Sequence, residues 1–492
     1  MTIRSILISA GNLQNDSPTG GGGGGIVLDS EPWALAVTDS VQQSVYTSCT
    51  GLDTAGNVYV SGQVYQLKTD LSNTTQSTYI CKFTNIGALQ WVKVFPDYMS
   101  EDTNYYFYIE PYCIASNIAG TKIYLTGYVE DTNNWYVYLG CINPTTGDVL
   151  WQRGIGEQYS QNNMTYYNGG YGHDIVCDPA GNIYVSGNIS FNNADCGLLV
   201  KFSSTGDIIW KKGFSSASAW GYGVEIDKNN NIVIAMESNL IDYNNATWTC
   251  VAKFTAAGQL LWIVDMKVAA SSWRQGQNRV AIDSNANVYV TGQNTITITG
   301  STKTGVDIIK LDGTTGYPVK ATILAPASGA GTNSNASSPV IKYNSKTDLF
   351  YVAYDTTYEA GTYILVWLDS NLLPQGNCRV ENVGAWDWGI NSLEIDSSGN
   401  VFIMTDGYFG GSGWRSAQLV KNANLSVPAP YVLGGSTFII SENACATDTN
   451  QTVAYTTSTT VSDITVDSVI INPIMINTRN EFVVTKIGLV KK

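Results

Sequence analysis

Charge is scarce in this chain of 492 residues, and positive charge is the scarcer kind. Charged residues make up 13% of the sequence, histidine occurs once, as His173, and the formal net charge is −14. Nucleic-acid binding depends on Lys and Arg clusters that neutralise phosphates, so this balance excludes it. It also disfavours binding to anionic membranes. Ser-His-Asp and Cys-His catalytic arrangements would both depend on His173.

The sequence also lacks long apolar runs and closely spaced cysteines. No stretch of 18 apolar residues occurs, so no transmembrane helix is expected. The apolar patch near the N-terminus is too short for a secretory leader, so we expect the chain to fold in the compartment where it is made. The nine cysteines include no CxxC and no adjacent pair. We expect buried, reduced thiols, with no metal site and no cofactor.

Glycine, asparagine, tyrosine and tryptophan are abundant, and they recur in a two-part phrase. The first part is GLDTAGNVYVSG at 51–62, and it returns as VCDPAGNIYVSG at 176–187. The second part is YICKFTNIGALQW at 79–91, and it returns as LLVKFSSTGDIIW at 198–210. Self-similarity at this spacing indicates a repeat architecture.

Seven copies of the phrase are counted from the residue at its GN position. These markers are Asn57, Lys122, Asn182, Asn231, Asn287, Asp348 and Asn400. Each copy resolves into four strands joined by short turns that carry Gly or Asn, as hairpins require. Four antiparallel strands in a unit of this size are typical of a propeller blade. The sequence therefore predicts an all-β chain, a seven-bladed β-propeller with four-stranded antiparallel blades.

Trp33 predicts how the ring closes. The fourth strands of successive copies share a tryptophan, at Trp91, Trp151, Trp210 and Trp262. One period before Trp91 lies Trp33, in a fourth-strand position that has no preceding blade. It would complete blade seven and remove the free sheet edges. The alternative is that residues 425–434 supply that strand.

The two ends of the chain do not repeat. Residues 1–30 form a polar arm with a glycine run at Gly20–Gly25, which is typical of flexible tethers. Residues 31–434 hold the propeller. Residues 435–492 are rich in Thr and Val and predict a small C-terminal β appendage, too short for an independent domain. We expect both ends to serve assembly with other subunits, in an oligomer.

The strand order divides the predicted disc into two faces. Turns between first and second strands, and between third and fourth strands, share one face and are short. Loops between second and third strands, and between blades, share the other face and are long and aromatic. Function concentrates in variable loops, and amphipathic rings suit sugars or protein surfaces. The expected binding face therefore consists of Tyr105, Tyr106, Trp135, Tyr166, Tyr167, Tyr171, Trp220, Tyr222, Trp248, Trp273, Arg274, Trp386, Trp388, Trp414 and Arg415. The alternative is that these rings plug the central channel or cover the blade tops.

Motifs for catalysis and metal binding are weak. His173, beside Asp174 near the start of an inner strand, is expected to be a hydrogen-bonding residue rather than a general base. Asp227, Asn229 and Asn231 match the first oxygen positions of a calcium loop, as do the corresponding residues from Asp283 onward. The Gly and terminal Glu of that motif are missing, so Asx-type turns are the better interpretation.

The phrase D-x-x-G-N-x-Y-V-S/T-G followed by K-F-x-x-x-G-x-x-x-W resembles the bacterial β-propeller repeats of the SBBP type, over about residues 30–425. NPTTGDVLW at 143–151 is also similar to the tryptophan-docked repeats of pyrroloquinoline-quinone propellers. Those enzymes also have a pair of adjacent cysteines, calcium-binding acids and an eighth blade. This chain departs from that pattern, because it has no adjacent cysteines and only seven predicted blades. The polar start, the PTGGGGGG tether and the Thr/Ser/Asn-rich tail look similar to virion proteins of tailed bacteriophages, such as fibre, nozzle and decoration proteins.

These features predict a non-enzymatic structural and adhesion protein of a phage virion, made in the host cytoplasm. The propeller would bind a partner virion protein or a host surface glycan, and residues 1–30 and 435–492 would contact other virion proteins. One alternative is a bacterial cell-surface or periplasmic propeller that binds protein or carbohydrate. Another is a glycan-active enzyme that uses the acid pairs Glu101 with Asp102 or Glu130 with Asp131.

Overall fold

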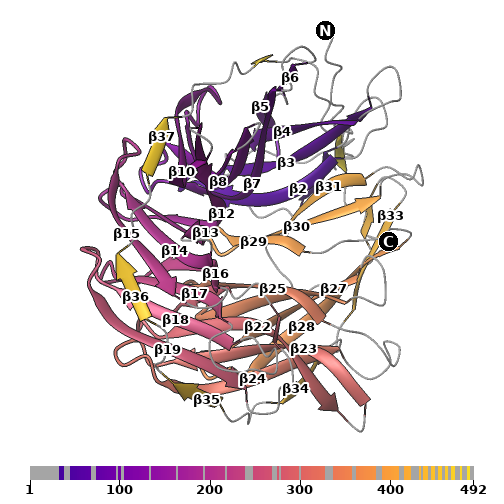
Figure 1. Cartoon of the computed structure of the whole chain (residues 1–492). Helices are drawn as coiled ribbons and strands as arrows, with labels where there is room; N and C mark the ends of the chain where they lie inside the picture. The colour runs from indigo at the N-terminus through magenta and orange to yellow at the C-terminus, as the bar shows by residue number, and fades with distance from the viewer. Residues whose placement is uncertain are drawn as a thin grey trace, which may run out of the picture.

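β-Strands are the only regular elements in the described part of the chain (Figure 1). A computed structural model describes residues 33–37, 45–67, 74–95, 98–100, 105–131, 134–161, 164–191, 194–215, 219–238, 248–268, 274–275, 279–298, 301–326, 336–356, 362–383, 390–408, 415–422, 431–433, 436–441, 445–448, 453–456, 460–463, 467–470, 477–478 and 485–487. Within these ranges, no helix is long and apolar enough to cross a membrane.

The described strands form seven antiparallel sheets, which confirms the predicted all-β propeller. Blade one is β2 (Val45–Leu52), β3 (Val58–Leu67), β4 (Thr74–Phe83) and β5 (Leu89–Phe95). Blade two is β7 (Tyr105–Ser116), β8 (Ile123–Asp131), β9 (Asn134–Ile142) and β10 (Val149–Gln161), with β6 (Tyr98–Ser100) and β11 (Met164–Asn168) at its edges. Blade three is β12 (Gly170–Cys177), β13 (Ile183–Phe191), β14 (Ala194–Phe202) and β15 (Ile208–Ser215).

The remaining blades follow the same order from the inner strand outward. Blade four is β16 (Ala219–Ile226), β17 (Ile232–Ser238), β18 (Trp248–Phe254) and β19 (Leu260–Val268). Blade five is β20 (Arg274–Gln275) and β21 (Val280–Ile282), both paired with β22 (Val288–Ile298), then β23 (Ser301–Leu311) and β24 (Pro318–Pro326). Blade six is β25 (Ala336–Asn344), β26 (Leu349–Thr356), β27 (Thr362–Leu368) and β28 (Pro374–Val383). Blade seven is β29 (Ile390–Ile395), β30 (Val401–Tyr408), β31 (Arg415–Asn422) and β1 (Trp33–Val37).

The ring closes through the N-terminal strand, as Trp33 predicts. β1 pairs with β31, and Trp33 lies opposite Lys421. The alternative is wrong, because β32 (Tyr431–Leu433), within residues 425–434, pairs with β33 (Ser436–Ser441) in the sheet of blade six. Blade seven also contacts blade one across the closure, where Asn391 Nδ2 donates to the carbonyl oxygen of Thr47 at 2.8 Å.

The strands of the C-terminal tail are distributed over the blades. After β33, which pairs with β28, the tail runs through β34 (Cys445–Asp448), β35 (Val453–Thr456), β36 (Thr460–Asp463), β37 (Asp467–Ile470), β38 (Asn477–Thr478) and β39 (Thr485–Ile487). These pair in turn with β24, β19, β15, β10, β5 and β1. The predicted appendage is therefore not a separate sheet, because each of its described strands extends a blade.

An aspartate closes the first turn of most blades. In blade one, the Asp53 carboxylate accepts hydrogen bonds from the backbone N–H groups of Ala55 (3.0 Å) and Asn57 (2.9 Å). It also accepts bonds from Asn57 Nδ2 (2.8 Å) and the Tyr59 hydroxyl (3.0 Å). Corresponding bonds to the Asn of the turn recur at Asp178, Asp227, Asp283 and Asp396. They confirm the predicted Asx-type turns.

The second half of the phrase docks three of the blades onto the next. Trp91 Nε1 and Lys82 Nζ both donate to the carbonyl oxygen of Pro144 in the following blade, each at 3.0 Å. The same arrangement occurs at two further junctions. Trp210 and Lys201 both donate to the carbonyl oxygen of Ala256, and Trp262 and Lys253 both donate to that of Gly313. The tryptophan and the lysine of the phrase therefore join neighbouring blades through a single acceptor.

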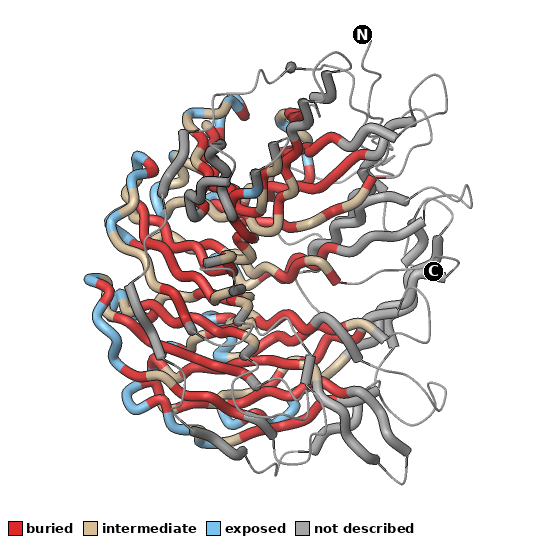
Figure 2. Tube along the Cα trace, in the orientation of Figure 1, coloured by how far each residue is buried: buried red, intermediate tan, exposed pale blue. Residues whose placement is uncertain are grey.

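The turn glycine of the phrase makes room for this contact. A Cβ atom at Gly258, where φ is +83°, would lie 3.1 Å from the ring of Trp210 in the preceding blade. A residue larger than glycine would push the two blades apart, and the left-handed φ favours glycine as well. Figure 2 shows the resulting pattern, with buried positions along the strands and exposed positions gathered at the turns.

Trp210→Phe tests the docking bond directly. The variant keeps a ring against Gly258 but loses the N–H that donates to Ala256 at 3.1 Å. We expect the free energy of unfolding, measured by urea denaturation, to fall by about 1 kcal/mol more than in a matched control. The control is Trp151→Phe, because Trp151 Nε1 is buried without a hydrogen-bond partner among the described residues. Equal losses in the two variants would show that the bond contributes nothing.

Candidate functional site

A cavity of about 420 Å³ lies at the centre of the ring. Residues from the inner strands of all seven blades line it, from β2, β7, β12, β16, β21, β25 and β29. Turn residues that follow three of these strands, Thr54, Asn117 and Ser397, line it too. The cavity therefore lies at the end of the channel that faces the short turns.

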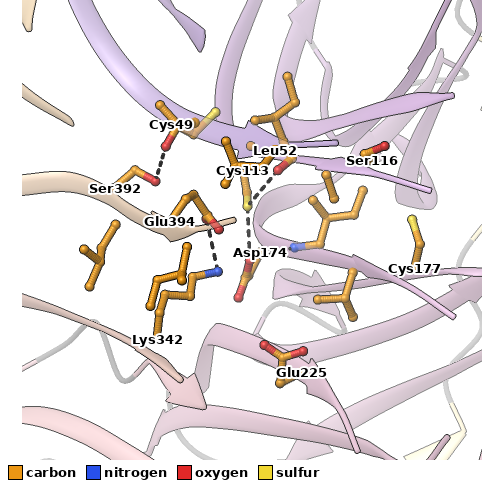
Figure 3. A pocket seen from close by; sticks show the side chains of 18 of the residues that line it. Cys49, Leu52, Cys113, Ser116, Asp174, Cys177, Glu225, Lys342, Ser392 and Glu394 are labelled. Carbon is orange, nitrogen blue, oxygen red and sulfur yellow. Dashed lines mark hydrogen bonds and ion pairs between the residues drawn. The ribbon is translucent and has the colours of Figure 1, made fainter. Parts of the chain in front are cut away.

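Five carboxylates and two basic side chains line the cavity, from Asp53, Asp174, Glu225, Glu394, Asp396, Lys342 and Arg279. The Lys342 ammonium lies 3.1 Å from a carboxylate oxygen of Glu394, across the boundary between blades six and seven. Figure 3 shows this pair and Asp174 directed toward the same space, with Glu225 nearby. Burial opposes the charge on Lys342, but Glu394, Glu225 and Asp174 outweigh it and raise the pKa of Lys342 above its ordinary value.

Asp174 joins three blades. Its Oδ1 accepts the backbone N–H of Ile175 at 2.9 Å and the thiol of Cys113, from blade two, at 3.1 Å. Its Oδ2 accepts the backbone N–H of Val224, from blade four, at 2.9 Å. Burial raises the pKa of the Cys113 thiol, and the Asp174 charge raises it further. Both the carboxylate and the thiol are therefore held as structural groups, because a cysteine nucleophile needs a lowered pKa.

Glu225 is a carboxyl group of the cavity whose pKa is shifted toward neutral pH. Burial raises its pKa to about 6, against the opposing effects of Lys342 and the backbone N–H of Ile226. Burial also raises the pKa of Glu394, and Lys342 opposes that shift. Shifted carboxyl groups in a cavity are candidates for proton transfer. In the described part of the chain, no group of three or more His, Cys, Asp or Glu is arranged to hold a metal ion.

Aromatic rings stack in the loop-side half of the inner strands of blades two to four. The Tyr171 and Trp220 rings are stacked at an interplanar angle of 16°, with centroids 6.3 Å apart. His173 stacks on Trp220 at 19° and 6.1 Å, and its centroid lies 4.8 Å from that of Tyr222. Tyr112 contacts His173 from blade two, at 5.4 Å. These rings bury one another's faces where they project from the strands.

His173 is a packed, neutral ring. Burial and the nearby charge of Arg279 lower its pKa to about 3, while a hydrogen bond with Asn188 opposes the shift. Its Nε2 is buried and has no hydrogen-bond partner among the described residues. A general base that works near neutral pH needs a pKa near neutrality, so His173 is unsuited to that role.

The predicted binding-face residues fall into four groups in the structure. Tyr171, Trp220 and Tyr222 come together, where they stack on each other and on His173. Trp135, at the start of β9, is 49% exposed. The backbone alone is described for Tyr105, Tyr106, Tyr166, Tyr167, Trp248, Arg274 and Arg415. Trp273, Trp386, Trp388 and Trp414 lie outside the described residues, as do Glu101 and Asp102. Glu130 and Asp131 end β8 on the loop side.

Sequence reasoning missed the charged cavity, although a signal for it exists. Glu225, Lys342 and Glu394 each lie six residues before the marker of their own copy of the phrase. The corresponding positions in other blades hold small or apolar residues, such as Gly51, Val176 and Ala281. A charged side chain at an inner-strand position that is otherwise apolar indicates a polar centre of the ring.

A second unpredicted surface lies at the rim of the short-turn face, and we call it the apolar rim. It consists of one exposed apolar residue at the same position in four successive blades, Leu150 (50% exposed), Ile209 (51%), Leu261 (49%) and Val319 (61%). Each residue immediately precedes the position of the docking tryptophan at the start of an outer strand. In blades one and six this position holds Gln90 and Gln375.

Comparison with known proteins gives no family and no curated relative that matches the chain. Among solved structures it is similar to the Dos1 propeller, at 9% identity and a TM-score of 0.44, covering 79% of this chain and 94% of that one. The β-propeller domain of the Trilobed protease from Pyrococcus furiosus matches at 10% identity and 0.41, covering 77% and 96%. The α-L-arabinofuranosidase Arb93A from Fusarium graminearum matches at 12% and 0.40, covering 62% and 91%. At these values the likenesses carry no argument about function, and the fold rests on the sheet topology.

The raised pKa of Glu225 makes stability depend on pH. In the folded protein this pKa is about 6 against an ordinary 4.5, so the folded state binds the proton more tightly. The contribution of protonated Glu225 to the free energy of unfolding is therefore complete below pH 4.5, and it is lost as pH rises through 6. We expect Glu225→Gln to gain up to about 2 kcal/mol at pH 7 and to flatten the pH profile of the free energy of unfolding.

Glu394→Gln is the matched control for this measurement. Burial raises the pKa of Glu394 too, but this variant also removes the ion-pair partner of Lys342, so we expect a smaller gain at pH 7 than in Glu225→Gln. A profile for Glu225→Gln that superimposes on the wild-type profile from pH 4.5 to 7 would contradict the assignment.

Proposed function

We propose that the protein is a non-enzymatic structural and adhesion protein of a phage virion, in which a rigid propeller docks a partner virion protein. The observation that carries this proposal is the apolar rim. Single exposed apolar residues are ordinary on protein surfaces. Four large ones recur at one repeated position in four successive blades, and exposed apolar residues gathered on one side of a protein are typical of interaction sites.

The rest of the short-turn face supports this docking role. Among the described residues, four further large apolar side chains are exposed in its turns, Ile86 (56%), Ile118 (53%), Tyr317 (55%) and Leu373 (43%). These turns join first to second strands or third to fourth strands, so they share one side of the disc with the rim residues. Rigid strands and turns present them with little entropy to lose on binding.

The chemistry of the channel supports a role without catalysis. Lys342 pairs with Glu394, and Asp174 accepts bonds from three blades. Burial raises the pKa of the Cys49 thiol, as it does for Cys113. Groups that hold each other in this way stabilise a ring but leave little for substrate.

The virion setting rests on the ends of the chain. The tail strands are already paired with the chain's own blades, so we assign the anchoring role to residues 1–30 and the docking role to the apolar rim. Trp135, exposed on the loop side, is the described residue best suited to contact a host surface glycan. A bacterial cell-surface or periplasmic propeller would use the same surfaces in another setting.

One observation favours a second candidate, a glycan-active hydrolase. Glu225, with a pKa raised to about 6, shares the cavity with Glu394, and paired carboxyl groups are the usual machinery of glycoside hydrolysis. Lys342 beside Glu394 argues against it, because the ion pair occupies the second carboxylate. Saccharide hydrolysis by the purified protein that is lost in Glu225→Gln would establish this candidate and refute the first.

The double variant Ile209→Asp with Leu261→Asp tests the docking role. Both side chains are about half exposed in the isolated protein, so we expect an unchanged Tm. Charge at the centre of an apolar interface would be buried without a partner, so we expect incorporation into particles to fall at least about tenfold. The measurement is quantitative immunoblotting of particles purified after complementation of a strain that lacks the protein.

The matched control is Gln90→Asp with Gln375→Asp, which places the same charges at the equivalent positions of blades one and six. We expect near-normal incorporation of this control. Normal incorporation of the Ile209 and Leu261 variant would remove the observation on which the proposed function rests.

A further inference from the structure

The C-terminal tail visits every blade in reverse order. Its strands pair with blade six, then five, four, three, two and one, and finally with blade seven. Figure 1 shows β35, β36 and β37 on the outside of blades four, three and two. A chain that passes all seven outer edges encircles the propeller, so we call the segment from Ser436 to Ile487 the belt.

The belt pairs with a constant part of each outer strand. In blade three, β36 pairs with Lys212–Ser215, and in blade two β37 pairs with Arg153–Gly156. Both stretches begin two residues after the docking tryptophan, on the loop-side half of the outer strand. The apolar rim, at the first half of the same strands, is left outside the belt pairing. The belt and the rim therefore divide the outer edge of the ring between them.

The last belt strand covers the strand that closes the ring. β39 pairs with the outer edge of β1, and Leu35 lies opposite Lys486. On its inner edge, β1 pairs with β31. Blade seven therefore contains both ends of the described chain, with its closing strand held between β31 and the end of the belt.

We propose that the belt is an intramolecular latch, whose acceptor is the outer edge of each blade and whose last strand secures the closure of the ring. An open outer edge carries unpaired N–H and C=O groups that invite pairing with other chains. The belt pairs such groups in all seven blades. Its strands are two to six residues long, so each one alone is weak, and their attachment depends on their being linked in one chain.

The latch has a defined point of release. Because β39 is the last strand of the belt, it can detach without disturbing the strands before it. Its detachment uncovers β1, the five-residue strand from Trp33 to Val37 that completes blade seven. Opening of the ring is therefore coupled to release of the C-terminal end, rather than to unfolding of any whole blade.

Crosslinking of the full chain tests whether the belt closes on its own ring. Leu35→Cys with Lys486→Cys places thiols at directly opposed positions of an antiparallel pair, where Cα atoms lie within disulfide reach. We expect mild oxidation to link them within a single chain on non-reducing gels, and to raise Tm in a way that dithiothreitol reverses. Wild-type protein, which has nine native cysteines, gives the background.

The matched control is Leu35→Cys with Ile439→Cys, because Ile439 lies opposite Glu381 in blade six. We expect no link in this control. Absence of the Leu35–Lys486 link would overturn the proposal. Links that join two chains would overturn it as well, since they would show that the tail is exchanged between copies.

Hydrogen exchange of the full chain tests the release point. Proline at position 486 removes a backbone N–H and disfavours strand pairing. We expect Lys486→Pro to speed exchange in β1 and β31 while β2 to β5 keep their wild-type rates. Lys486→Ala, which keeps the backbone N–H, is the control and should leave exchange unchanged. Equal exchange in β1 for wild type and Lys486→Pro would contradict the latch.

Discussion

One carbonyl oxygen, shared by a tryptophan and a lysine of the preceding blade, sets the spacing on which the ring depends. Trp210 and Lys201 both donate to the carbonyl oxygen of Ala256, and the Trp210 indole also packs against Gly258. One contact therefore constrains the indole, the turn that holds Ala256 and the positive φ of Gly258. Burial of the indole and satisfaction of its N–H occur in the same contact. The same contact recurs at three junctions of the described ring, from blades one, three and four to the blade that follows each.

Departures from the phrase keep the contact by other means. In blade two, Cys141 stands at the position of the lysine, and Trp151 Nε1 has no hydrogen-bond partner among the described residues. Arg153 lies over the Trp151 ring at 5.3 Å, and it donates to the carbonyl oxygen of Thr205, in the next blade, at 3.1 Å. In blade four the tyrosine of the phrase is Val233, and Lys253 forms an ion pair with Asp227 at 2.8 Å. Burial raises the pKa of Asp227, yet Lys253, Asn231 and Asn229 together hold it below its ordinary value.

The centre and the outer edge are the two regions of the ring that the docking contact leaves free to vary. The centre of the ring holds the Lys342–Glu394 ion pair, and Tyr171, His173 and Trp220 stack on its loop side. The outer edge is divided between the belt and the apolar rim. The four rim residues lie outside the stretches of the outer strands that the belt pairs with.

Much of the fold follows from local pattern. The alternation of apolar and polar residues predicts the strands, and the Asp and Gly of the phrase predict the turns. Trp33 predicts how the ring closes. The belt could not be predicted, because strands as short as Asn477–Thr478 show no period and their partners lie hundreds of residues away. The aromatic stack was hidden for another reason. The register shifts between Gly172 and Asp174, so His173 leaves the simple alternation of its strand.

Imaging the protein in its native assembly, at a resolution that shows side chains, tests the account most directly. The account predicts that Ile209 and Leu261 are buried against another protein, and that the Lys342–Glu394 pair is intact in a cavity without substrate. A short-turn face open to solvent, together with a saccharide held between Glu225 and Glu394, would contradict it.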